Sequence, residues 1–100
     1  MSLPLFEKVA FIGLGLIGSS LARVIIAEKL ANQIVASTRS QKTLDDAKAL
    51  GLIQEGYTNP IDAVQGADLV VLALPVRATQ KVLEIIQPYL SEKTIITDVG

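Results

Sequence analysis

Three glycines at a fixed spacing carry the clearest chemical signal in the sequence. Gly13, Gly15 and Gly18 form the pattern G-x-G-x-x-G directly after the apolar run of residues 9–12. Without side chains, the first glycine permits a tight turn, the second lets the backbone approach a pyrophosphate, and the third lets a helix pack closely. The amides that open this helix also favour negative charge. The pattern therefore predicts a dinucleotide site at Gly13, Gly15, Leu16, Ile17 and Gly18.

A group of polar residues follows the next predicted strand, where it would face the same dinucleotide. NAD sites place an Asp or Glu there, about twenty residues after the glycines, to bind the ribose 2′-hydroxyl. This chain has Ser37, Thr38, Arg39 and Ser40 instead. Hydroxyl groups and a guanidinium bind a 2′-phosphate, which a carboxylate would repel. The sequence favours NADP, with NAD as the alternative. The competing interpretation is an ordinary solvated turn in which Arg39 pairs with Asp45 or with nothing.

Histidine and cysteine are absent from all 100 residues. Proton transfer near neutral pH usually relies on histidine. We therefore expect the acid/base group of any oxidoreductase reaction to lie outside this chain, and we predict no catalytic residue and no metal site within it. Without cysteine there is also no disulfide framework.

The composition is that of one small globular domain. Half of the residues are apolar and the formal net charge is −1, a balance that gives no support to nucleic-acid binding. The longest apolar stretch, residues 69–76, is too short to span a bilayer. The N-terminal residues lack the pattern of a signal peptide. We expect a cytoplasmic protein with no nucleic-acid or membrane partner.

Strands and helices are predicted to alternate along the chain. Ser40 and Asn59 are expected to cap the second and third helices, and Gly51 to end the second. Proline at position 75 would end a strand and open the fourth helix. Apolar runs predict strands at residues 8–13, 33–37, 52–58, 69–74 and 94–99. Helical spacing predicts helices at residues 16–29, 41–50, 60–65 and from residue 76 to about 90.

Helical spacing also predicts which apolar side chains face the sheet. In the first helix these are Ile17, Leu21, Val24 and Ile25. In the second helix they are Leu44, Ala47 and Leu50.

This alternation predicts an α/β fold of βαβ units, a Rossmann-type doubly wound parallel sheet with strand order 3-2-1-4-5. A cofactor would lie across the carboxyl ends of strands one and four. A domain of this kind usually needs a further strand and a partner domain. We therefore expect residues 1–100 to be an incomplete dinucleotide-binding domain, the front part of a longer enzyme.

With these features in place, the chain closely resembles the prephenate/arogenate (cyclohexadienyl) dehydrogenase family of tyrosine biosynthesis. The string GLGLIGSSLA at residues 13–22 is the most specific feature of this resemblance. The turn TRS at residues 38–40, the strand end LALPV at residues 72–76 and TDVG at residues 97–100 support it. The resemblance covers essentially the whole chain, but only the N-terminal cofactor-binding part of the family.

The resemblance implies an NAD(P)-dependent oxidoreductase that decarboxylates prephenate or arogenate oxidatively, passing a hydride from the ring to the nicotinamide. It implies that Leu74, Pro75 and Val76 line the cofactor. It also implies a downstream histidine and a mostly helical downstream domain, which would complete the substrate site and form a homodimer. We expect the present residues alone to be inactive.

Two other functions remain open from the sequence. One is another β-hydroxyacid or imine dehydrogenase with the same front half. The other is a Rossmann module that senses a nucleotide without catalysis, because a fold does not guarantee chemistry. The choice between prephenate and arogenate, and any feedback inhibition by tyrosine, also stay open.

Overall fold

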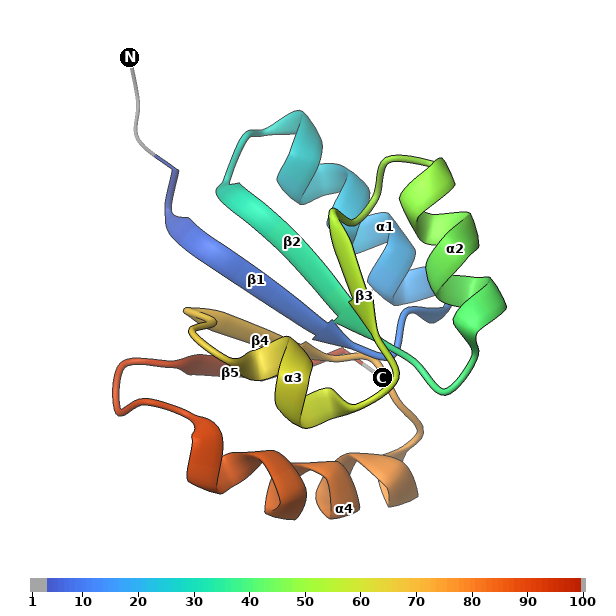
Figure 1. The fold of residues 1–100 in the computed structure, drawn as a ribbon. Coiled ribbons are helices and arrows are strands. Elements are labelled where there is room, and N and C mark those ends of the chain that lie inside the picture. The colour runs from blue at the N-terminus through green and yellow to red at the C-terminus, as the bar shows by residue number, and fades with distance from the viewer. Residues whose placement is uncertain (1–3, 100) are drawn as a thin grey trace.

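The computed structural model describes residues 4–99. They form one sheet of five strands, all parallel to their neighbours, in the order β3-β2-β1-β4-β5 (Figure 1). The predicted fold class and strand order are therefore confirmed. The strands are β1 (Phe6–Ile12), β2 (Ala31–Ser37), β3 (Glu55–Tyr57), β4 (Leu69–Leu72) and β5 (Ile95–Asp98).

Helices cover both faces of the sheet. On one face lie α1 (Gly15–Ala27) and α2 (Gln41–Ala49). On the other lie α3 (Pro60–Val64) and α4 (Val76–Ile86), and the short 3₁₀ helix η1 (Gln87–Tyr89) continues α4 (Figure 1). None of the helices in the described part of the chain is long and apolar enough to cross a membrane.

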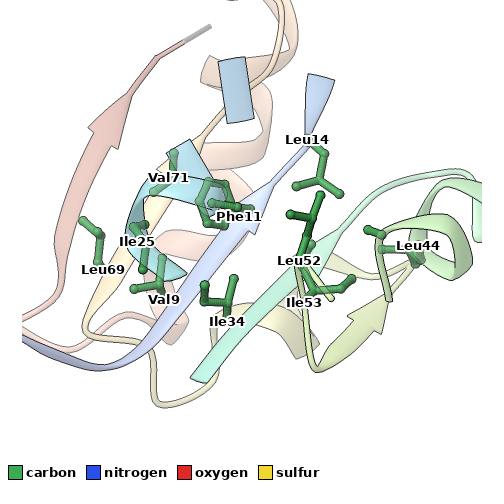
Figure 2. Close-up of a cluster of buried hydrophobic side chains, with 13 residues drawn as sticks. Val9, Phe11, Leu14, Ile25, Ile34, Leu44, Leu52, Ile53, Leu69 and Val71 are labelled. Carbon is green, nitrogen blue, oxygen red and sulfur yellow. The ribbon is translucent and has the colours of Figure 1, made fainter. Parts of the chain in front are cut away.

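Each face of the sheet has its own apolar core. Side chains alternate along a strand, so Phe11 of β1 and Val71 of β4 pack with Ile25 of α1 (Figure 2). Ala10, Ile12 and their neighbours on β4 pack on the opposite side, against α3 and α4. All four residues of β4 are buried, as an uninterrupted apolar strand in a parallel sheet should be.

The predicted caps at Ser40, Asn59 and Gly51 are confirmed, whereas α1 ends at Ala27 and α4 at Ile86, earlier than predicted. The Ser40 side chain accepts a hydrogen bond from the Thr43 amide at 3.2 Å, and Asn59 accepts one from the Ile61 amide at 3.0 Å. Gly51 follows α2 with a φ of 76°, the left-handed conformation that glycine adopts at low cost.

Two predicted helix faces were partly wrong. In α1 the buried residues are Gly18, Ala22 and Ile25, whereas Ile17 and Val24 are 59% and 51% exposed. The small residues face the sheet because α1 lies close to it, and this turns the larger side chains outward. Leu50 is also exposed, at 65%, because it lies beyond the last residue of α2.

Two predicted strand boundaries also differ. The structure ends β4 at Leu72, two residues before the predicted end, and Ala73 and Leu74 belong to the loop that follows. In contrast, Asn32 and Gln33 are not a turn but part of β2, because the chain reverses earlier, at Lys29, whose φ is 53°.

Candidate functional site

The fold brings the predicted site residues to one edge of the sheet. β1, β2 and β4 are neighbours and run parallel, so the loops after their carboxyl ends meet at the same edge (Figure 1). This is the edge where open α/β sheets bind ligands. The predicted site residues at this edge come from three segments. After β1 they are Gly13 in the loop and Gly15, Leu16, Ile17 and Gly18 at the start of α1. The others are Ser37 at the end of β2 with Thr38, Arg39 and Ser40 after it, and Leu74 and Pro75 in the loop after β4 with Val76 at the start of α4.

Gly13 is fixed by its conformation and by its neighbours. Its φ is 80°, and a Cβ at this position would collide with the carbonyl oxygen of Ala73 and come within 2.7 Å of the Leu74 side chain. Its amide donates to the Ser37 carbonyl at 2.8 Å. The glycine loop is therefore tied directly to the ends of β2 and β4.

The other two glycines differ in what surrounds them. A Cβ at Gly18 would lie 3.1 Å from the Ala73 Cβ, so this glycine permits close contact between α1 and the loop after β4. Gly15 has a φ of 52° and no heavy atom within 4 Å of the position a Cβ would take. The space beside Gly15 is open, and it lies at the first residue of α1, where helix amides attract anions.

The loop after β2 is held by its own hydrogen bonds. Thr38 Oγ1 donates to the Ser40 carbonyl at 2.8 Å, and the Thr38 amide donates to the Tyr57 carbonyl at 3.2 Å. Ser40 Oγ accepts from the Thr43 amide, so its hydroxyl hydrogen can still be donated to a ligand. Ser37 is buried.

Arg39 is exposed and forms no ion pair within residues 4–99, where Lys42–Asp46 is the one pair present. The alternative partner for Arg39, Asp45, instead accepts a hydrogen bond from Gln41 at 3.0 Å. The first turn of α2 contains no acidic residue. A guanidinium, a hydroxyl donor and a helix N-terminus therefore occupy the place where a carboxylate would otherwise stand.

The loop after β4 is anchored at the start of α4. Thr79 is buried, and its hydroxyl donates to the Pro75 carbonyl at 3.2 Å, with the Leu74 carbonyl at 3.4 Å as the alternative acceptor. Val76, by contrast, is 79% exposed. Leu16, in the first turn of α1, is 90% exposed.

A cavity of about 450 Å³ lies between the ends of β2 and β4, on the face covered by α3 and α4. This size is within the usual range for small-molecule sites. Five predicted site residues line it together with Ile12, namely Ser37, Thr38, Arg39, Leu74 and Pro75. Ser40, Val76 and the residues of the glycine loop do not line it.

The other half of this cavity wall was not predicted from the sequence. It consists of Ala78, Val82 and Ile85 on α4 and Thr58 and Pro60 at the start of α3. The three α4 residues follow the helical spacing i, i+4, i+7. This spacing is the feature of the sequence that could have identified these residues, but an apolar stripe of this kind is usually assigned to the core.

Asp68 lies just before β4, at the opposite edge of the sheet from these site residues, and its carboxylate accepts a hydrogen bond from the Glu7 amide at 2.6 Å. Within residues 4–99, no three His, Cys, Asp or Glu side chains are grouped so as to hold a metal ion.

Comparisons with known proteins point to dehydrogenases. Residues 8–99 match the family model described as NADP oxidoreductase, coenzyme F420-dependent. The cyclohexadienyl dehydrogenase of Zymomonas mobilis is 40% identical over 98% of this chain and 33% of its own length. The prephenate dehydrogenase of Bacillus subtilis is 32% identical over 94% of this chain and 26% of its own.

Solved structures give the same result. The arogenate dehydrogenase of Synechocystis matches with a TM-score of 0.82 and 31% identity, over 94% of this chain and 33% of that one. The prephenate dehydrogenase of A. aeolicus, in complex with hydroxyphenyl propionate and NAD⁺, matches with a TM-score of 0.84 and 27% identity, over 98% and 34%. The resemblance to the N-terminal part of these enzymes is confirmed, and the chain spans about a third of their length.

Proposed function

Because the chain belongs to the family described as NADP oxidoreductase, coenzyme F420-dependent, we propose that it is the dinucleotide-binding part of a prephenate or arogenate dehydrogenase that uses NADP. Such an enzyme catalyses oxidative decarboxylation in tyrosine biosynthesis. Similarity to cyclohexadienyl and prephenate dehydrogenases over nearly the whole chain supports this substrate class. The helical substrate domain, the catalytic residues and the homodimer would lie in the rest of a longer cytoplasmic protein.

The glycine loop is the observation that carries the dinucleotide part of the proposal. The open space beside Gly15, at the first residue of α1, fits a pyrophosphate that is held by backbone amides. Gly13 and Gly18 hold the surrounding loops in contact, which keeps the amides of Leu16 and Ile17 in place. When bound, the cofactor would supply the hydride acceptor of the reaction.

The loop after β2 supports NADP as the cofactor. Arg39 and the Ser40 hydroxyl would bind the 2′-phosphate, with Ser37 and Thr38 shaping the wall behind it. The absence of an acidic residue in the first turn of α2 removes the group that would repel this phosphate. The alternative is NAD, which is bound in the related A. aeolicus enzyme.

Steady-state kinetics of the complete gene product test this function. We expect oxidation of prephenate or arogenate with a higher kcat/KM for NADP than for NAD. Carbon dioxide should form in equal amount with the reduced cofactor. A product that oxidises neither substrate with either cofactor would contradict the proposed reaction, and a preference for NAD would contradict only the cofactor assignment.

A further inference from the structure

One flank of α1 carries apolar side chains that face away from α2. Gly15 and Ser19 line a small cavity against α2, so they mark the flank of α1 that faces that helix. Ile17, Leu21 and Val24 follow the spacing i, i+4, i+7 about half a turn away. Ile17 and Val24 are 59% and 51% exposed. Since α2 connects β2 and β3, this apolar flank points toward β4 and β5.

The neighbouring part of the sheet is apolar and exposed on the same face. Ile95 of β5 is the register partner of Leu69, which belongs to the core on the α1 side, so its side chain points to that side too. Ile95 is 55% exposed. Val99, just beyond β5, packs partly against the same core, as does Leu21 of α1. These side chains form one apolar surface, which we call the α1–β5 surface: Ile17, Leu21, Val24, Ile95 and Val99.

The helices of the described chain do not cover this surface. α1 and α2 connect β1, β2 and β3, whereas α3 and α4, which connect β3, β4 and β5, lie on the other face of the sheet (Figure 1). A parallel sheet is normally covered on both faces. The α1–β5 surface is therefore the part of the sheet that residues 4–99 leave open on the α1 side.

The shape and the area of the α1–β5 surface indicate what covers it. One side of it is a helix and the other a strand, so a second helix laid beside α1 at about 8–10 Å would contact both. Five side chains, all partly buried already, offer less than the roughly 800 Å² that each partner buries in a stable interface between separate proteins. A segment of the same polypeptide needs less area, because docking costs it little translational freedom. The relatives are about three times as long as this chain, and their remaining length can supply such a segment.

We propose that a helix from the part of the longer protein that follows residue 100 packs on the α1–β5 surface, alongside α1. This inference rests on the part of the proposed function that assigns the chain to a longer protein. It goes beyond that function because it names the surface through which the dinucleotide-binding part joins the rest. The occupying helix should carry its own apolar stripe with the spacing i, i+3, i+4, i+7.

Single cysteines test whether this surface is covered in the complete gene product. Residues 1–100 contain no cysteine, so Val24→Cys places one thiol on the α1–β5 surface. Its alkylation by iodoacetamide, followed on the peptide by mass spectrometry, should be at least about tenfold slower in the native protein than in urea. Ile26→Cys is the matched control, because Ile26 is 43% exposed on the opposite flank of α1. Its alkylation in the native protein should be close to that in urea.

A cross-link identifies the occupant. An aliphatic diazirine amino acid incorporated at position 24 should join α1 to a residue beyond position 100 of the same subunit, and so leave the monomer mass unchanged on a denaturing gel. Ile95→Cys, on the strand side of the surface, should be protected from alkylation as Val24→Cys is. Thermal unfolding shows whether each variant is folded, and Ile95→Cys carries the test if Val24→Cys is not.

The outcomes separate this inference from the proposed function, because neither readout requires activity or a bound cofactor. Alkylation of folded Val24→Cys as fast as that of Ile26→Cys would overturn the inference, and so would a cross-link only to a partner subunit or another protein. Protection with an intramolecular cross-link, in a protein that oxidises neither prephenate nor arogenate, would contradict the proposed function and leave this inference standing. An active enzyme with an unprotected thiol at position 24 would do the reverse. A gene product that ended at residue 100 would overturn both.

Discussion

At the scale of single residues, the proposed preference for NADP depends on Arg39. Arg39→Ala in the complete enzyme should lower kcat/KM for NADP and leave kcat/KM for NAD nearly unchanged. A hydrogen bond to a charged group contributes about 1.5–3 kcal/mol, so the selective loss should be about ten- to a hundredfold. Thr38→Asp should go further and invert the preference, because a carboxylate accepts from the ribose and repels the phosphate.

The control for this prediction is Arg23→Ala, which removes an exposed arginine from the middle of α1. It should affect neither cofactor. Equal losses for NAD and NADP in Arg39→Ala would mean that this arginine has a structural role, and the NADP assignment would then be wrong.

Gly15 allows a test of the pyrophosphate position that separates binding from folding. Gly15 and Gly51 both have positive φ and no heavy atom within 4 Å of a Cβ position. Alanine at either position should therefore cost a similar amount of stability, about 1–2 kcal/mol for the left-handed backbone. Only Gly15→Ala should weaken cofactor binding, because its methyl group would occupy the phosphate space.

Chemical denaturation and a cofactor titration of both variants measure the two effects. A loss of cofactor affinity in Gly51→Ala as large as that in Gly15→Ala would show that strain, not phosphate space, is responsible. Gly13→Ala should behave differently from both. Its methyl group would meet the Ala73 carbonyl, so we expect a larger loss of stability.

At the scale of elements, the N-terminus of α2 has a capping role and a proposed role in phosphate binding, and substitutions at Ser40 can separate them. Ser40→Ala removes the cap of α2 and should lower the free energy of unfolding by about 1 kcal/mol. Ser40→Asp retains a good cap, so stability should be nearly unchanged, but its carboxylate stands near the proposed 2′-phosphate. The Ser40→Asp substitution should weaken the binding of NADP and leave the binding of NAD unchanged.

Urea unfolding and the affinities for both cofactors check these expectations. If Ser40→Asp binds NADP as well as the parent chain does, the phosphate does not lie at this helix end.

The elements themselves could be predicted from the sequence because local signals agreed with the fold. Capping residues, the glycine loop and the apolar run that became β4 all belong to single segments, so they predicted boundaries to within a few residues. The faces of α1 could not be predicted in the same way. Ile17 and Val24 have core-like spacing, but the close contact of Gly18 with Ala73 turns α1 so that small residues face the sheet.

The same limit applies to the candidate site. The strand ends that carry Gly13, Ser37 and Leu74 could be identified because parallel strands bring their carboxyl ends together. The apolar half of the cavity could not, because the position of α4 relative to α3 depends on packing between distant segments. Ala78 and Ile85 looked like ordinary helix residues until that packing was known.

At the scale of the whole molecule, binding and catalysis should be separable. We expect residues 1–100 to bind the cofactor weakly and to oxidise neither prephenate nor arogenate, because the chain contains no histidine and the proposed substrate site lies elsewhere. Absorbance of the reduced cofactor at high protein concentration measures this. Substrate oxidation above that of a Gly13→Ala control would show that the chain contains its own catalytic group.

The central position of β1 has a consequence for how the protein is made. β1 is synthesised before both of its neighbours in the sheet, β2 and β4, and three helices separate it from β4 in the sequence. One edge of this apolar strand therefore stays unpaired until residues 69–72 have been synthesised. Open strand edges and exposed apolar surface promote aggregation, and parallel pairing between distant segments is slow. We therefore expect this protein to need a chaperone during its synthesis more than after it has folded.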